Sequence, residues 1–175
     1  MTRILGALGT ADGTGVVRME DRFETGIDDV WAALTDPARL AHWLGDVEGD
    51  LRLGGEFGAH FYASGWEGTG RIEACNPPRR LLVQTRDADT PDAAYEHAIE
   101  VTLAADGVAT EIVWEERGMP ANLLSAYGAG IQVHVEDLAS YLFGGERCDA
   151  AARFGELHPA YQELVASLSY RGASA

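Results

Sequence analysis

The segment PANLLSAYGAGIQVHVEDLASYLFGG, residues 120–145, carries the longest uninterrupted helical pattern in the chain. Its main apolar residues recur at spacings of three and four and so share one helix face: Leu124, Tyr127, Ile131, Val135, Leu138 and Leu142. Asn122 is a candidate N-cap, and Gly144-Gly145 is a candidate stop. Because helices in proteins are stabilised mainly by packing an apolar face, this helix needs a surface to lie on.

Two glycines, Gly128 and Gly130, lie in the middle of this expected helix. Each costs about 1 kcal/mol relative to alanine at an interior helical position. Two explanations stay open at this point. The glycines allow the helix to pack closely on a strand, or they leave room for a ligand beneath the helix.

Length and charge limit the classes of protein to consider. The 175 residues predict one domain, 1–175, with an N-terminal hairpin strand in 1–15 and an extra helical tail in 146–175. A hydrophobic content of 46% indicates a globular fold rather than disorder. The net charge is −15, whereas nucleic acids and anionic membrane surfaces bind basic proteins, so neither is expected as a partner.

The sequence indicates neither membrane insertion nor secretion. No apolar run approaches the ~18 residues of a membrane span, and residues 1–13 lack the apolar core of a signal peptide. Cys75 and Cys148 have no metal-ligand spacing and no partner motif. Two reduced thiols and a cytoplasmic location are therefore expected.

The rest of the chain reads mostly as strands separated by turns. Alternation and turn signals predict strands over 3–9, 15–25, 47–52, 55–62, 66–75, 80–86, 95–103 and 110–117. Asp12-Gly13 makes the first two a hairpin. Residues 27–44 predict two short helices around Asp36-Pro37, an N-cap followed by proline at the first helical position. This order implies an α+β fold in which a curved antiparallel sheet packs against the long helix with a cavity between them.

Several short motifs follow one another along this pattern. They are VWAALTDP (30–37), GGEF (54–57), GRI (70–72), PPRRL (77–81), TEI (110–112), and Gly130 followed by HVEDL (134–138). In this order they resemble the SRPBCC superfamily of START-like and polyketide-cyclase-like proteins, and within it the branch homologous to activators of the heat-shock-protein-90 ATPase. The resemblance covers residues 15–143 and implies a helix-grip fold, in which a curved antiparallel sheet wraps around a long C-terminal helix.

The superfamily includes lipid carriers, cyclases, aromatases, ring-hydroxylase subunits and co-chaperones, so the resemblance leaves the function open. Many relatives carry a tryptophan directly after the glycine of the long helix, where this chain has Ile131. A smaller side chain at this position enlarges or reshapes the expected pocket.

A set of mostly apolar side chains is expected to form the walls of that pocket. The candidate ligand-binding residues are Trp43, Phe57, Trp66, Ile99, Trp114, Tyr127 and Ile131, with His134 or His97 as a polar contact. Aromatic walls with few polar groups suit a small apolar or aromatic ligand. For the tryptophans, core and cavity wall are both open, and strand register decides whether His60 or the Phe57/Phe61 face lies inward.

The sequence offers only weak catalytic candidates, His134 and His97. His134 is either a hydrogen-bonded residue at the edge of the core or a group that orients a ligand or transfers protons. The five histidines form no metal-binding pattern, and no nucleotide, dinucleotide or nucleophile-elbow motif is present. No metal and no cofactor are therefore expected.

Three functions remain to be distinguished. The first is a binding protein for a small hydrophobic ligand, which does not catalyse a reaction. The second is a cyclase- or aromatase-like enzyme in the same cavity, which needs an acid/base pair converging there. The third is a co-chaperone-like module that regulates an ATPase or a stress response; a chaperone partner is implied by the family resemblance alone. A monomer and a homodimer are both compatible with the sequence.

Overall fold

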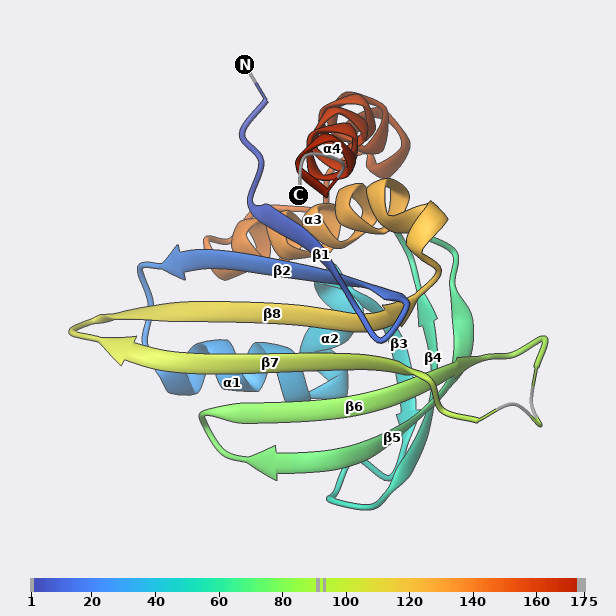
Figure 1. Ribbon diagram of the computed structural model, residues 1–175. Helices are drawn as coiled ribbons and strands as arrows, with labels where there is room; N and C mark the ends of the chain where they lie inside the picture. Colours follow the sequence, from blue (N-terminus) through green and yellow to red (C-terminus); the bar gives the residue numbers. More distant parts are fainter. Residues whose placement is uncertain (1, 91, 93, 173–175) are drawn as a thin grey trace.

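The structure, a computed structural model that describes residues 2–90, 92 and 94–172, consists of an eight-stranded antiparallel sheet and four α-helices (Figure 1). The strands lie in the order β1-β2-β8-β7-β6-β5-β4-β3. Their bounds are β1 Gly6–Ala11, β2 Thr14–Phe23, β3 Gly45–Gly49, β4 Glu56–Phe61, β5 Glu67–Asn76, β6 Arg80–Asp87, β7 His97–Asp106 and β8 Ala109–Met119. The helices are α1 Ile27–Thr35, α2 Pro37–Trp43, α3 Leu124–Leu142 and α4 Ala150–Gly172, with a 3₁₀ turn η1 Ala121–Leu123 before α3.

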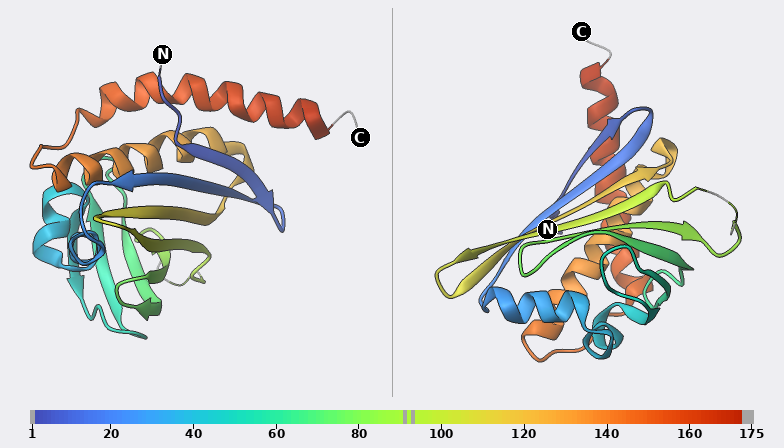
Figure 2. Two further views of the ribbon diagram at one scale, coloured as in Figure 1. Left: turned by 90° about the vertical axis from the view of Figure 1, so that its left-hand side faces the viewer. Right: turned by 90° about the horizontal axis from the view of Figure 1, so that it is seen from below.

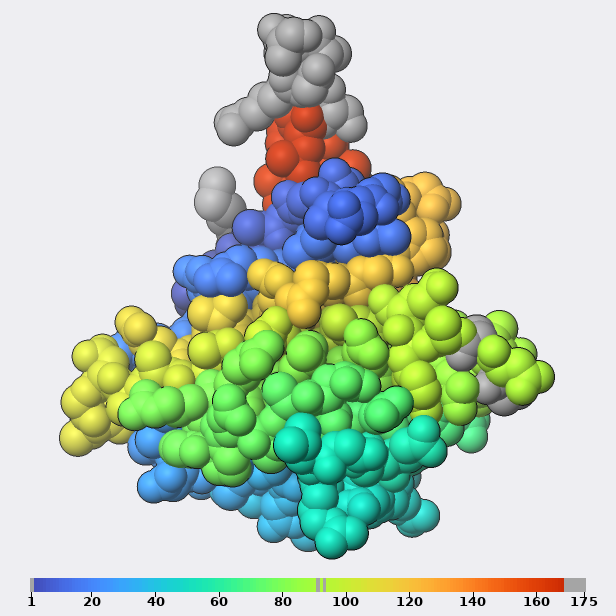
Figure 3. Space-filling view, turned by 60° about the horizontal axis from the view of Figure 1, so that its bottom comes forward, coloured from blue at the N-terminus to red at the C-terminus, as the bar shows by residue number. Residues whose placement is uncertain are grey.

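The sheet curves around α3, which confirms the predicted α+β helix-grip fold (Figures 1 and 2). The two residues of the first predicted turn, Asp12 and Gly13, both have positive φ values, 52° and 81°, as a tight hairpin requires. In the space-filling view the strands follow one another across the outer side of the sheet, and α4 projects beyond β1 and β2 (Figure 3).

The short helices α1 and α2 are joined by the capped turn that the sequence predicts. The carboxylate of Asp36 accepts a hydrogen bond from the backbone N–H of Ala38 at 2.9 Å, and Pro37 is the first residue of α2. Trp43 at the end of α2 is fully buried and donates its Nε1–H to the carbonyl of Ala33 on α1, at 3.0 Å. This bond fixes the two helices to each other beneath the sheet (Figure 1).

The inner face of the sheet carries the core. On β7 and β8 the alternation places Val101, Leu103, Ile112 and Trp114 inward, all nearly or fully buried. Val101 lies directly opposite Trp114 in the antiparallel register. The core is therefore built between these long central strands and the helices α1, α2 and α3.

The long helix differs from the prediction at its start. Asn122 is part of η1 and does not cap α3, whose first residue is Leu124 and whose N-cap position makes no side-chain hydrogen bond. The predicted N-cap is wrong because Pro120 first directs the chain into a 3₁₀ turn. The predicted stop is confirmed: α3 ends at Leu142, and Gly144 takes a positive φ of 78°.

The tail after Gly145 forms α4, which lies along α3 on the side away from the sheet (Figure 2). Tyr161 of α4 is fully buried; its hydroxyl donates to Gln132 Oε1 on α3 at 2.6 Å and accepts from the N–H of Gly6 at 3.1 Å. Gln132 also accepts from the N–H of Leu5 and donates to the carbonyl of Arg3. The polar side of α3 is therefore covered by α4 and by the N-terminal segment.

Gly128 is explained by this second layer. A Cβ at Gly128 would lie 2.6 Å from the ring of Tyr161 and 3.2 Å from Leu8. The glycine thus allows both α4 and β1 to approach α3 closely. The sequence analysis expected close packing on a strand, as β1 provides, but not on a second helix. Gly130, two residues on, has open space where its Cβ would be.

Two further observations concern the cysteines and the length of the helices. Cys75 and Cys148 are both free, with Cys148 exposed. Within the described residues, no helix combines the length and the apolar composition needed to cross a membrane.

Candidate functional site

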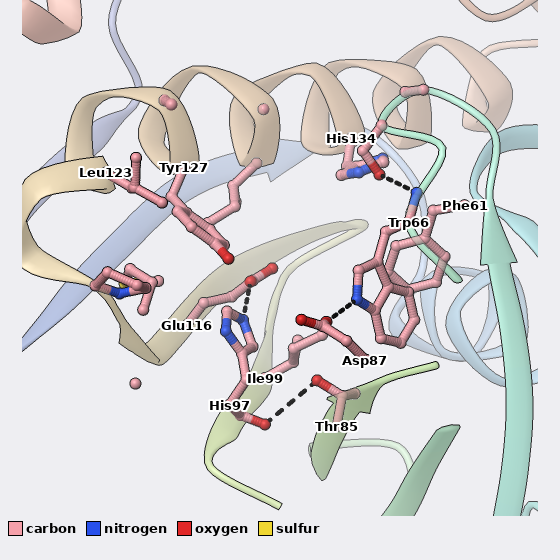
Figure 4. Close-up of a pocket in the computed structure, with 18 of the residues that line it drawn as sticks. Phe61, Trp66, Thr85, Asp87, His97, Ile99, Glu116, Leu123, Tyr127 and His134 are labelled. Atoms are coloured by element: carbon pink, nitrogen blue, oxygen red, sulfur yellow. Dashed lines mark hydrogen bonds and ion pairs between the residues drawn. The ribbon is translucent and has the colours of Figure 1, made fainter. Parts of the chain in front are cut away.

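A cavity of about 940 Å³ lies beneath α3, against the inner face of the sheet (Figure 4). Its walls come from α3, from β4, β6, β7 and β8, from the loop between β4 and β5, and from the first turn of α4. Exposed lining residues, among them Asp87, Thr90, Glu96 and Leu123, mark the side that opens to solvent, between the β6–β7 loop and the start of α3.

The structure brings most of the predicted site residues into this cavity, but not all. Its lining includes Trp66, Ile99, Tyr127, Ile131 and His134 of the predicted ligand-binding set, and also His97. Trp43, Phe57 and Trp114 instead line a smaller neighbouring cavity of about 140 Å³, between the helices α1 and α2 and the sheet. Ile99 lines both cavities and lies where the two adjoin.

The structure settles which face of β4 lies inward. Phe57 and Phe61 lie on the inner face, whereas His60 between them is exposed. Phe61 lines the main cavity, where its ring packs against Trp66 at a centroid distance of 4.8 Å. The ring of Phe57 lies over Gly70 of β5, whose missing side chain makes room for it.

A histidine–carboxylate pair forms the polar part of the cavity. His97 Nε2 lies 2.6 Å from Glu116 Oε2, and the other carboxylate oxygen of Glu116 accepts a hydrogen bond from Trp114 Nε1 at 2.9 Å. The side chain of Glu116 is only 8% exposed. A carboxylate so deeply buried needs such partners, because an unpaired buried charge is costly.

The pair biases His97 towards its protonated form. Burial alone would lower the pKa of His97, but the hydrogen bond and the negative charge of Glu116 outweigh burial and raise the pKa above its ordinary value of 6.5. Tyr127 of α3 stacks on the His97 ring, with centroids 5.6 Å apart. Burial, together with the charges of Asp87 and Glu116, raises the pKa of Tyr127, so its hydroxyl stays protonated.

His134 lies at the other end of the cavity, two turns further along α3 (Figure 4). It is 6% exposed, and the ring of Phe61 stands edge-on to it at 5.6 Å. Its Nδ1 atom is buried and has no hydrogen-bond partner among the described residues. Burial lowers the pKa of His134, so the ring is neutral at physiological pH.

The sequence analysis missed two acidic residues that accept hydrogen bonds within the cavity, Glu116 and Asp87. Glu116 follows Ile112 and Trp114 at the same period of two, so the alternation of β8 was the signal that placed it inward. Asp87 accepts a hydrogen bond from Trp66 Nε1 at 2.7 Å. Asp87 is the last residue of β6, and no sequence pattern indicated that it faces the cavity, because its position depends on how β5 and β6 pair.

The chemistry available is that of a mostly apolar cavity with two polar positions. No group of three or more His, Cys, Asp or Glu side chains suited to a metal ion occurs in the part of the chain that the structure describes. The arrangement can enclose an aromatic molecule, donate and accept hydrogen bonds at its two ends, and move a proton at His97.

Solved structures with the same fold include two that are similar in sequence. CalU16 from Micromonospora echinospora is 27% identical, with a TM-score of 0.73 over 91% of this chain and 96% of CalU16. DynU16, a protein from the dynemicin biosynthetic locus, is 25% identical with a TM-score of 0.66, over 79% of this chain and 51% of DynU16.

A more distant match is an HSP90 activator from Plasmodium falciparum, PFC0360w. It is 18% identical with a TM-score of 0.52, over 61% of this chain and 74% of that protein, and it shows the shared fold alone. A search of curated proteins found no match.

The family comparison agrees with the resemblance seen in the sequence. The model described as "Activator of Hsp90 ATPase homolog 1-like protein" matches residues 24–143, which contain every element from α1 to α3. The match leaves out β1, β2 and α4, which cover α3 and complete the sheet. The chain therefore belongs to the family of Activator of Hsp90 ATPase homolog 1-like proteins.

Proposed function

We propose that the protein binds a small apolar or aromatic ligand in the cavity beneath α3. The observation that carries this proposal is the cavity itself, whose volume of about 940 Å³ is typical of small-molecule sites, roughly 300–1,000 Å³. Gly130 supports it, because a glycine in mid-helix is unfavourable and this one has no neighbouring atom within 4 Å that requires it. Its absent side chain leaves cavity space open.

The comparisons are compatible with a small molecule as the ligand. DynU16, which is 25% identical, comes from a biosynthetic locus. The helix-grip fold hosts several activities, so the proposal depends on this chain's own cavity rather than on the fold.

The test is a thermal-shift screen with a matched pair of variants. Sterols, flavonoids, polyketides and fatty acids are screened against the wild type, Gly130→Leu and Gly155→Leu. Both glycines are helical and neither has an atom within 4 Å of its would-be Cβ, but Gly130 lines the cavity and Gly155 lies exposed on α4. The two substitutions therefore give the same gain in helix propensity, and only one of them fills the cavity.

A ligand at 100 times its dissociation constant should stabilise the wild type and Gly155→Leu by about 2.7 kcal/mol. Gly130→Leu should fold and show no shift. The proposal fails if no compound shifts the wild type, or if Gly130→Leu responds as strongly as Gly155→Leu.

The His97–Glu116 pair favours one second candidate, an enzyme that transfers protons in the same cavity. A histidine held by a carboxylate is a common general acid or base, and the position of the pair in the cavity supports this candidate. His97→Gln separates the two candidates once a ligand is known. An enzyme should lose turnover far more than affinity, whereas a carrier shows no turnover to lose.

The family description suggests a third candidate function, the regulation of an Hsp90-class chaperone by direct contact. If neither ligand nor turnover is found, a pulldown with that chaperone, followed by an ATPase assay, decides whether the chain acts as its regulator.

A further inference from the structure

We propose that the cavity takes a flat, neutral aromatic ligand that carries one hydroxyl group for His134 and another for the His97–Glu116 pair. This inference rests on the proposed function, because it names the chemistry of the ligand in the same cavity. Four observations carry it: the aromatic walls, the two polar positions, their separation along α3, and the acidic surroundings.

The walls favour a flat aromatic molecule. Phe61, Trp66 and Tyr127 all line the cavity, and each of these rings already packs against another cavity ring. Tyr127 lies nearly parallel to His97, with 29° between the planes. Aromatic rings prefer offset-stacked or edge-to-face neighbours, so a planar ligand gains contacts here that a flexible aliphatic chain does not.

His134 provides the first polar position. Its Nδ1 is enclosed without a partner, so Nε2 is the ring nitrogen left to meet a ligand. Because the buried ring is neutral, Nε2 is a donor in one tautomer and an acceptor in the other. A hydroxyl group suits either tautomer, since it both donates and accepts.

The His97–Glu116 pair provides the second position. Glu116 accepts hydrogen bonds from Trp114 Nε1 and from His97 Nε2, so the proton of His97 lies on Nε2. No hydrogen bond joins His97 Nδ1 to a described residue, and the side chain is 21% exposed. Nδ1 accepts when His97 is neutral and donates when it is protonated, and a hydroxyl again serves both states.

The separation of the two positions sets the length of the ligand. Tyr127, which stacks on His97, and His134 are both on α3 and seven residues apart. At 1.5 Å per residue they are about 10 Å apart along the helix axis. Figure 4 shows His97 and His134 at different ends of the open space, with Tyr127 above His97. A ligand that reaches both positions must therefore span a distance of about this size.

The charges near the cavity disfavour an anionic ligand. Asp87, Glu96 and Glu116 line it, and the whole chain carries a net charge of −15. Arg86 also lines the cavity, and it contacts the ring of Tyr95 and the hydroxyl of Thr69. A carboxylate placed among these acids would be repelled, whereas a neutral hydroxyl would not.

The test measures dissociation constants by titration calorimetry for four probes: biphenyl, para-hydroxybiphenyl, para,para′-dihydroxybiphenyl and biphenyl-para-carboxylate. The dihydroxy compound is rigid and carries its two hydroxyl groups at opposite ends, so that one can face each polar position. A hydrogen bond contributes about fivefold in affinity, so each added hydroxyl should tighten binding by about that factor. The carboxylate should bind more weakly than biphenyl.

His134→Phe is the informative variant, because it keeps a buried ring and removes the nitrogens. In this variant the second hydroxyl should add nothing to the affinity gained from the first, whereas in the wild type each hydroxyl adds about fivefold. The inference is overturned if hydroxyl groups add no affinity to the wild type, if His134→Phe keeps the full gain, or if the carboxylate binds best.

A different result would show that the proposed function itself, ligand binding in the cavity, is wrong. Biphenyl would then not bind at all, or it would bind Gly130→Leu as well as the wild type. Biphenyl binding that Gly130→Leu abolishes, without any benefit from hydroxyl groups, would retain the proposed function and reject only the hydroxylated ligand.

Discussion

At the scale of single residues, the two glycines of α3 differ in their surroundings, because close packing requires a glycine at Gly128 but not at Gly130. Gly130→Ala should raise the free energy of unfolding by about 1 kcal/mol, because it improves helix propensity and meets no neighbour. Gly128→Ala should lower it by about 1–2 kcal/mol, because its Cβ would overlap the buried ring of Tyr161. Urea denaturation of both variants checks the pair; equal effects would contradict these explanations.

The His97–Glu116 pair predicts a pH dependence of stability. The folded-state pKa of His97 is raised, so the folded protein holds this proton more tightly than the unfolded chain does. The stabilisation from the pair is then fully present below the ordinary pKa of 6.5 and is lost as the pH rises through the folded-state value.

The measurement compares the free energy of unfolding of the wild type with that of His97→Gln across this range. The difference between the two proteins should shrink as the pH rises. A difference that grows with pH would mean that His97 is neutral in the folded protein.

The sequence predicted some of these residues and not others, for physical reasons. His97 follows the period-two alternation of its strand, which placed it inward with Ile99. Glu116 obeys the same rule on β8, but its burial depends on partners from two strands, which one strand does not reveal. Trp43 and Trp114 line the smaller cavity rather than the main one. The sequence did not predict this placement, because an apolar residue type alone does not distinguish the core from a cavity wall.

At the scale of elements, Tyr161 holds α4 to the rest of the molecule. Tyr161→Phe removes the donor to Gln132 and the acceptor for the Gly6 N–H, both buried or partly buried. The free energy of unfolding should fall by about 1–3 kcal/mol, the cost of leaving such groups unpaired.

Ser167→Ala on the exposed side of the same helix is the matched control and should change stability by less than about 0.5 kcal/mol. Urea denaturation measures both variants. Equal effects of Tyr161→Phe and Ser167→Ala would show that the hydroxyl network does not fix α4.

Most helices and strands were predictable because their signals are local. Alternation and turn residues located the strands, and Asp36-Pro37 located the junction of α1 and α2. The position of α4 was not predictable, because an amphipathic pattern shows that a helix needs a surface but not which one. The side of α3 that contacts α4 is polar and carries Gln132 and Glu136. The hydrogen bonds of Gln132 to Tyr161 and Arg3 form only when α3, α4 and the N-terminal segment meet.

At the scale of the whole molecule, the order of elements predicted an α+β fold with a curved antiparallel sheet and a cavity beneath the long helix, and the family resemblance implied the helix-grip fold. The division into a large cavity under α3 and a smaller one against α1 and α2 was not predictable, because it depends on how side chains such as Phe57 and Phe61 fill the inner face of the sheet. The family match covers α3 and the strands that line this space, whereas α4, whose first turn also lines it, lies outside the match.

The central claim is that a ligand occupies the cavity beneath α3, and native mass spectrometry of protein purified from its own cells tests it most directly. The wild type and Gly155→Leu should both carry a mass above that of the chain, released on denaturation, while Gly130→Leu should lack it. The same bound mass on Gly130→Leu, or none on any of the three proteins, would contradict the claim.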